Sequence, residues 1–162
     1  MLGYVHGHDQ EIAQFVASRI PHCHRGFGPN VKATGVIDEE GRLIAGIVYH
    51  NWQPDFGWIE ISGAALPGKQ WLSRETLKQM YRYPFHVCGC QMVVQLTPAD
   101  NESLLYVLHR FGYELIKLPR MYGHDRDGVA CHLTREAWEE NKFNKRLKHH
   151  LPDALPSIHE AA

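Results

Sequence analysis

The first half of the chain shows one helical pattern of apolar and polar positions, followed by extended β-rich runs. In residues 8–20, Ile12, Val16 and Ile20 recur at helical spacing, and Asp9 is placed to cap that helix. A short strand is predicted before it, at residues 2–5. Three extended runs rich in β-forming residues follow, at residues 32–38, 42–52 and 56–66. A glycine-containing turn joins the first two runs, which predicts a hairpin.

The second half of the chain alternates between helical and extended patterns. Ser73 is a good N-cap for a helix that Pro84 should end, and Asn101 and Gly112 are placed to begin and end a second one. Predicted strands occupy residues 90–96, 113–118 and 128–134, and a last helix occupies residues 135–147. The order β-α-β-β-β-α-β-α-β-β-α predicts one mixed α/β domain over residues 1–147, with a loosely ordered tail at 148–162.

Composition excludes several classes of protein. The 162 residues are 44% hydrophobic and carry a formal net charge of −1, so broad binding to a nucleic-acid backbone is not expected. There is no apolar run long enough to cross a membrane and no secretory signal pattern. Four cysteines in this length do not form a disulfide scaffold. We therefore expect a cytoplasmic protein without membrane partners.

Four segments follow one another along the chain: GRLIAGIVYHNW, WLSRETLKQMYRYPF, GCQMVV and N…RFGY…DGVACHLTREAW. Together they resemble the GNAT superfamily of acyl-CoA-dependent N-acyltransferases, in particular small members that are often encoded by phages. The resemblance covers about two thirds of the chain. It implies a mixed, mostly antiparallel sheet that splays open between strands 4 and 5, with helices on both faces. It also implies that acetyl-CoA is the co-substrate.

The resemblance places the cofactor on two parts of the chain. The pantetheine arm would pair with the backbone of the fourth strand at Ile61, Ser62 and Gly63. The pyrophosphate would lie on a loop and helix N-terminus, where free N–H groups and the helix dipole favour anions. The residues implied for this loop and for the contact at the next helix are Gly68, Lys69, Trp71, Leu72, Ser73, Arg74 and Asn101.

This loop departs from the family pattern, because Trp71 and Ser73 stand where the family has small residues and Gly68 stands where it has a long polar one. Lys69 and Arg74 could supply the missing positive charge. Two hypotheses follow for Trp71. Either the indole turns away from the phosphate and anchors the loop, or it fills the cofactor channel. A simple turn before a packing helix, with Asn101 as an ordinary N-cap, is the alternative to the phosphate site.

The catalytic groups are less well defined. Glu60 is a candidate general base, and a backbone N–H near Ser62 or Gly63 could stabilise the oxyanion. An exposed strand carboxylate is the alternative for Glu60. The usual tyrosine of the family, seven residues after the asparagine, is replaced here by Leu108. The remaining candidates for the thiolate acid are Tyr113, Tyr122 and water; Tyr106 lies on the wrong side of its helix.

Other clusters suggest weaker alternatives. The His22-Cys23-His24 run and the cysteine pair at 88 and 90 lack the ligand spacing of structural zinc sites, so no metal is expected. Three aromatic residues near strand ends are more simply interpreted as hydrophobic lids or core, and the alternative is that they lie at the substrate mouth: Trp52, Phe56 and Trp58.

Two functions remain: transfer of an acetyl group to a primary amine, or a degenerate domain that binds CoA or a protein without catalysis. The amine could belong to a small molecule, to a protein or to an aminated nucleobase, which is the only expected contact with nucleic acid. A homodimer is an open alternative to a monomer.

Overall fold

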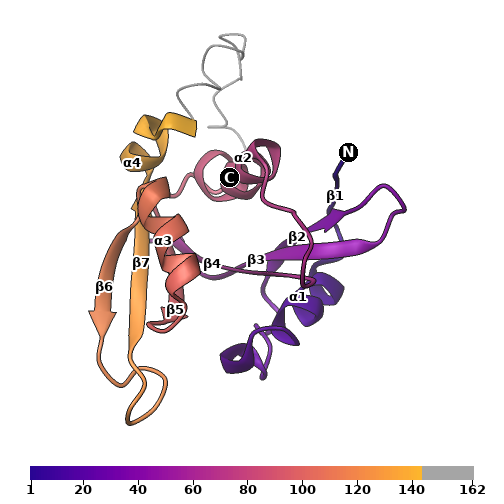
Figure 1. Ribbon diagram of the computed structural model, residues 1–162. Coiled ribbons are helices and arrows are strands. Elements are labelled where there is room, and N and C mark those ends of the chain that lie inside the picture. The colour runs from indigo at the N-terminus through magenta and orange to yellow at the C-terminus, as the bar shows by residue number, and fades with distance from the viewer. Residues whose placement is uncertain (144–162) are drawn as a thin grey trace.

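In the part of the chain that the computed structural model describes, residues 1–143, seven strands form one sheet and four α-helices pack on it (Figure 1). The strands are β1 (Gly3–Val5), β2 (Lys32–Ile37), β3 (Leu43–Gln53), β4 (Trp58–Ala65), β5 (Met92–Pro98), β6 (Glu114–Leu118) and β7 (Gly128–Thr134). The helices are α1 (Asp9–Ala17), α2 (Arg74–Arg82), α3 (Glu102–Phe111) and α4 (Arg135–Glu140). The predicted tail at 148–162 lies outside the described residues.

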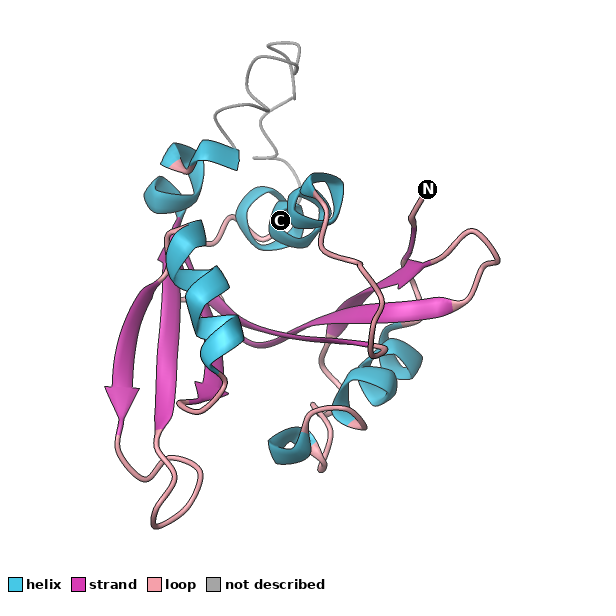
Figure 2. Ribbon diagram, viewed as in Figure 1, coloured by secondary structure: helices cyan, strands magenta, loops and turns pink. Residues whose placement is uncertain are grey.

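The strand order is β1-β2-β3-β4-β5-β7-β6, and within residues 1–143 only the β4–β5 pair is parallel. This confirms the expected mixed, mostly antiparallel sheet. The β4–β5 pairing covers only Trp58–Glu60 against Met92–Val94, after which the two halves of the sheet diverge (Figure 2). None of the helices in the described part of the chain has the length and hydropathy needed to span a bilayer.

Helix α1 covers one face of the β1–β4 half of the sheet. It packs closely because Gly35 and Gly46, which pair across β2 and β3, leave room for its side chains. A Cβ at Gly46 would lie 2.7 Å from Val16 and 2.9 Å from Ile12. Val48 continues the contact as a fully buried side chain. Helix α1 therefore lies flat against the strand that leads into β4.

The opposite face is covered by α2, α3 and α4, which share one large core cluster with the sheet. Tyr81 of α2 stacks on Phe111 of α3, with ring centroids 5.0 Å apart. Phe85, in the π-helical turn Tyr83–Val87 that follows α2, stacks on Trp138 of α4 at 5.0 Å. The Arg135 guanidinium donates to the carbonyl groups of Phe85 and Cys90, so the start of α4 is tied to the turn after α2.

Most helix boundaries follow the expected signals. Ser73 caps α2 through its hydroxyl, and Gly112 ends α3 with a φ of +116°. Asp9 is not the cap of α1: His8 holds that position, and the Asp9 carboxylate instead accepts the Ala33 N–H at 2.8 Å. The Ala33 N–H is available for this contact between α1 and β2 because the pairing of β2 with β1 covers only Gly35–Ile37. Helix α4 ends at Glu140, because the Asn141 backbone is extended, and residues 144–147 of the predicted last helix lie outside the described residues.

Candidate functional site

The gap between β4 and β5 exposes backbone groups of β4. Neighbouring residues of a strand direct their N–H and C=O groups to opposite edges, and the Leu66 N–H donates to Ile44 of β3. The even-numbered residues from Glu60 to Leu66 therefore face β3, and Gly63 faces β5. Since β4–β5 pairing ends at Glu60, the Gly63 N–H and C=O point into the gap. Of the two backbone N–H groups considered for an oxyanion, this geometry favours that of Gly63 over that of Ser62.

Two cavities meet at this gap. The first, of about 450 Å³, opens on the α1 side and is here called the α1-side cavity. The second, of about 500 Å³, opens between α2 and α3 and is called the α2-side cavity. Gly63, Gln95 and Leu104 line both cavities. A ligand that passes through the gap would therefore touch both sides of the sheet.

The loop that enters α2 has the features of an anion site. Gly68 has a φ of +73°, which the turn requires, and the Ser73 hydroxyl accepts the Thr76 N–H at 3.1 Å. The N–H groups from residue 71 to residue 75 make no hydrogen bond to another described residue. Lys69 and Arg74 are exposed and form no ion pair within residues 1–143. The predicted phosphate cradle is thus open and flanked by two cations.

Trp71 lies between this loop and the gap. Its side chain is partly buried, packs on two core clusters, and lines the α2-side cavity. The tip of the indole, Cη2, would be 3.6 Å from a Cβ at Gly63, so the ring lies over the β4 backbone. Its carbonyl accepts the Thr76 hydroxyl at 2.6 Å. Trp71 is therefore both an anchor of the loop and a wall of the α2-side cavity, while the neighbouring Leu72 is 48% exposed.

Glu60 is a partly buried carboxyl rather than an exposed one, which answers the alternative raised by the sequence. Only 14% of its side chain is accessible, and burial raises its pKa above the ordinary value. Its Oε2 lies 3.6 Å from His50 Nε2, and the same nitrogen lies 2.9 Å from Ser62 Oγ. Because both partners share one ring nitrogen, these residues do not form a serine–histidine–acid relay. Burial lowers the pKa of His50 to about 4, which keeps the ring neutral at pH 7.

The 3₁₀ turn Pro21–Cys23 crosses toward the other half of the sheet and closes one end of the α1-side cavity. The His22 ring lies 4.7 Å from the Tyr122 ring. Burial, followed by the charge of Arg126, lowers the pKa of His22. Burial raises the pKa of Tyr122 to about 12, so its phenol stays protonated at neutral pH.

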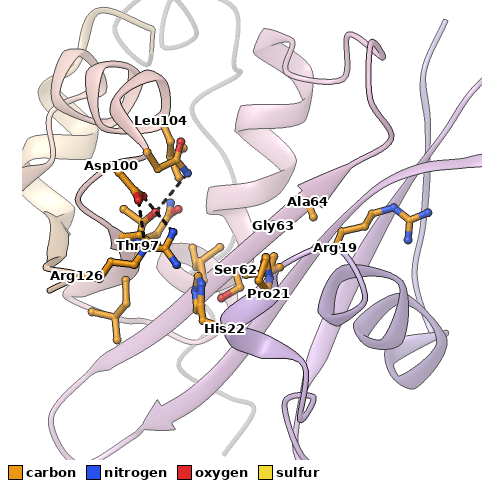
Figure 3. A pocket seen from close by; sticks show the side chains of 16 residues that line it. Arg19, Pro21, His22, Ser62, Gly63, Ala64, Thr97, Asp100, Leu104 and Arg126 are labelled. Carbon is orange, nitrogen blue, oxygen red and sulfur yellow. Dashed lines mark hydrogen bonds and ion pairs between the residues drawn. The ribbon is translucent and has the colours of Figure 1, made fainter. Parts of the chain in front are cut away.

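Arg126 and Asp100 form the opposite wall, where Arg126 Nε lies 3.1 Å from Asp100 Oδ2 (Figure 3). Asn101 lies beside them and begins α3 by position, but its side chain donates to Thr97 Oγ1 at 3.3 Å instead of capping the helix. Its contact with a cofactor stays a prediction. Ser62 lies on the facing strand, on the floor of the cavity.

The residues considered for the thiolate acid lie in different environments. Leu108 is buried and contributes only an apolar wall to the α2-side cavity. Tyr106 is 62% exposed, and its hydroxyl accepts from Arg110 at 2.8 Å. Tyr113 is 2% exposed and makes hydrogen bonds within the core, as described below. Tyr122 lies near Glu60 and does not line the α2-side cavity.

Two other groups of residues fall outside the site. Trp52 and Phe56 are exposed at the β3–β4 turn, and together with Trp58 they line neither of the two cavities. Within residues 1–143, no three His, Cys, Asp or Glu side chains lie close enough to hold a metal ion.

Sequence reasoning missed His50, Gln95 and Arg126. His50 and Ser62 lie directly opposite Glu60 and Val48 in the β3–β4 register, so the predicted hairpin could have indicated the His50–Glu60 contact. Gln95 is a polar residue within an apolar strand, which is a recognisable signal for a buried polar role. Arg126 carried no such signal.

No family model matches the chain. No curated protein matches its sequence either. Solved structures do match its fold. Mutant forms of the spermidine/spermine N-acetyltransferase SpeG from Vibrio cholerae align with a TM-score of 0.68 at 11% identity, covering 85% of this chain and 97% of that chain.

A dodecameric structure of spermidine N-acetyltransferase from Vibrio cholerae gives a TM-score of 0.68 at 12% identity, covering 86% of this chain and 96% of that chain. A protein from T. thermophilus, itself only provisionally described as an acetyltransferase, gives 0.62 at 19% identity, covering 77% of this chain and 69% of that chain. At these identities the similarity concerns the fold, and the chain has a GNAT-like fold.

Proposed function

We propose that this protein is an N-acyltransferase that moves an acetyl group from acetyl-CoA to a primary amine. The observation that carries the proposal is the gap between β4 and β5, where the unpaired backbone of Gly63 faces two cavities that open on opposite faces of the sheet. Such a gap lets a thioester and an amine approach each other from two sides. The GNAT-like fold and the acetyltransferases that share it support the same activity.

In this proposal acetyl-CoA occupies the α2-side cavity. Its pyrophosphate binds the open N–H groups from residue 71 to residue 75, with Lys69 and Arg74 as flanking cations. Its arm runs past Trp71 and along the unpaired edge of β4 at Gly63. The Gly63 N–H stabilises the oxyanion that forms when the thioester is attacked.

The amine approaches through the α1-side cavity. It must be neutral to attack, and its proton leaves toward Ser62, His50 and Glu60, which lie in contact beneath that cavity. The raised pKa of Glu60 makes the carboxylate a stronger base than an exposed glutamate. Attack on the carbonyl carbon forms the C–N bond, the C–S bond then breaks, and CoA leaves as a thiolate.

The charges of the α1-side cavity bear on the acceptor. The matching SpeG proteins are named for polyamines. Here Arg19 and Arg126 line the cavity, and Asp100, the one carboxylate among the residues that line it, is paired with Arg126. This lining offers no free anion for a polycation. We therefore expect monoamines to be better acceptors than spermidine.

Calorimetry with acetyl-CoA and with CoA tests the binding step, and thiol release in the presence of a panel of amines tests the transfer. The proposal predicts micromolar binding and amine-dependent thiol release that Glu60→Gln lowers. A second function, CoA binding without catalysis, is favoured by the apolar Leu108 and by the indole of Trp71 over Gly63. Binding without turnover for any amine would select this second function, and absence of binding would exclude both.

A further inference from the structure

Three polar side chains form a buried chain that ends at the junction of the two cavities. Gln95 Nε2 donates to the Tyr113 hydroxyl at 2.8 Å, and the Tyr113 and Tyr81 hydroxyls lie 2.6 Å apart. The side chains come from β5, from the segment before β6 and from α2. All three are at most 8% exposed. Burial of this many polar atoms is unfavourable unless their hydrogen-bonding capacity is used.

The three hydrogen-bonded side chains have more donor hydrogens than their mutual contacts use. Gln95 carries two amide hydrogens and each tyrosine carries one, which makes four donor hydrogens. With the amide oriented as above, one N–H and one O–H are engaged, and one of each is left over. If the amide is reversed, Tyr113 donates to the Gln95 oxygen, Tyr81 donates to Tyr113, and both N–H groups are left over. In either orientation, two donor hydrogens of Gln95, Tyr113 and Tyr81 have no acceptor in these two contacts.

The side chains that carry these donors lie at the place where negative charge would develop. Gln95 lines both cavities, Tyr81 lines the α2-side cavity, and Gln95 is the first residue of β5 beyond the last β4–β5 pair. Gly63 lies across the gap from it on β4. On the α3 side of the same cavity, Leu108 offers no donor.

We propose that Gln95, held in place by Tyr113 and Tyr81, donates a hydrogen bond to the CoA sulfur as it leaves as a thiolate. The inference rests on the proposed acetyl transfer. In this step the C–S bond breaks, the electron pair stays on sulfur, and the amide N–H stabilises that charge without giving up its hydrogen. The amine proton goes to the Glu60 side, and the thiolate takes its proton from solvent after release. Gln95 is thus a catalytic residue, and the two tyrosines are positioning residues.

The tyrosines are suited to this role rather than to proton transfer. Burial raises the pKa of both Tyr81 and Tyr113 above the ordinary range, so both keep their hydrogens at any working pH. The Tyr113 hydroxyl holds the Gln95 amide in place through its hydrogen bond, and the Tyr81 hydroxyl holds that of Tyr113.

The test uses hydroxylamine as the amine, because it is small, largely neutral at pH 7, and able to reach the thioester without specific contacts. Thiol release from acetyl-CoA is followed for the wild type and for Gln95→Met, Tyr113→Phe and Tyr81→Phe. We expect kcat to fall roughly 100-fold in Gln95→Met, as when one oxyanion donor is removed, and less in the tyrosine variants. KM for acetyl-CoA should change less than about threefold, because the donor acts on charge present only in the transition state.

Tyr4→Phe is the matched control. The Tyr4 hydroxyl also bonds to α2, at 2.9 Å from Thr76 Oγ1, but Tyr4 lines neither cavity. This variant should keep the wild-type kcat even where its melting temperature falls as much as that of Tyr81→Phe. A merely structural role of the chain would lower kcat in both variants in proportion to stability.

The outcomes separate the inference from the proposed function. If the wild type accelerates the reaction and Gln95→Met keeps its kcat, this inference is wrong and the proposed function stands. If Gln95→Met loses affinity for acetyl-CoA but not kcat, Gln95 only binds the cofactor and the inference is also wrong. If the wild type binds acetyl-CoA but gives no acceleration, the inference fails and the non-catalytic function is selected.

Discussion

The buried His50 predicts a specific dependence of stability on acidity. In the folded chain its side chain is 13% exposed, its ring lies 4.7 Å from the ring of Phe27, and burial lowers its pKa to about 4. In the unfolded chain the pKa returns to the ordinary value of 6.5. Between these values the unfolded state binds more protons than the folded state. The stabilisation that the neutral His50 ring gives should therefore be complete above about pH 6.5, and the free energy of unfolding should lose this contribution as the pH drops toward 4.

The size of the effect follows from the shift. A difference between 6.5 and about 4, at about 1.4 kcal/mol per pKa unit, corresponds to about 3 kcal/mol. Glu60 acts in the opposite direction, because burial raises its pKa and the folded state then gains protons above 4.5. As the pH falls through that window, the Glu60 contribution stabilises the fold and offsets part of the His50 loss.

Urea unfolding at several pH values between about 7 and 4 measures the contributions of His50 and Glu60 to the free energy of unfolding. In a Glu60→Gln background, the protein should lose about 3 kcal/mol more over this range than the same protein with His50→Gln added. His8→Gln, at a histidine whose side chain is 60% exposed, is the control variant. Parallel curves with and without His50 would refute the reasoning, since they would show that the ring is protonated alike in both states.

Three further predictions concern the cofactor loop and metal. Trp71→Ala should lower the free energy of unfolding by about 2–3 kcal/mol, less than the loss for a fully buried tryptophan, because Trp71 is only partly buried. Trp71→Gly should not tighten acetyl-CoA binding in calorimetry. Tighter binding at an unchanged melting temperature would mean that the indole fills the channel. Lys69→Ala combined with Arg74→Ala should weaken CoA binding by about 1–3 kcal/mol, and a folded double variant of wild-type affinity would remove both side chains from the site. Elemental analysis of the purified protein should show no stoichiometric zinc, and zinc whose chelation unfolds the chain would contradict this.

Local signals in the sequence determined most of the elements of the fold. Ser73 and Gly112 act over one helical turn, and the β-rich composition of the runs that form β2, β3 and β4 is likewise local. These are effects of the backbone that act within a few residues, so the sequence alone is sufficient to predict them. The resemblance of four segments to a known family then predicted the splayed sheet, which the strand pairing confirms.

Several features depended on groups that are distant in the sequence. Asp9 does not cap its helix because the Ala33 N–H, 24 residues away, is a better donor. Glu60 is buried because the β3–β4 register places His50 beside it and the 3₁₀ turn lies near it. The aromatic residues of the β3–β4 turn lie outside both cavities, although their place at the strand ends suggested the substrate mouth.

The contact between Gln95, Tyr113 and Tyr81 shows most clearly what the tertiary structure decides. The sequence shows only a polar residue, Gln95, in an apolar strand. Gln95 and Tyr113 are 18 residues apart along the chain, and Tyr81 and Tyr113 are 32 residues apart. Neither propensity nor periodicity acts over such distances. Only the packing of α2 and α3 on the open edge of β5 brings the three side chains together, because their polar atoms, once buried, must find partners in one another.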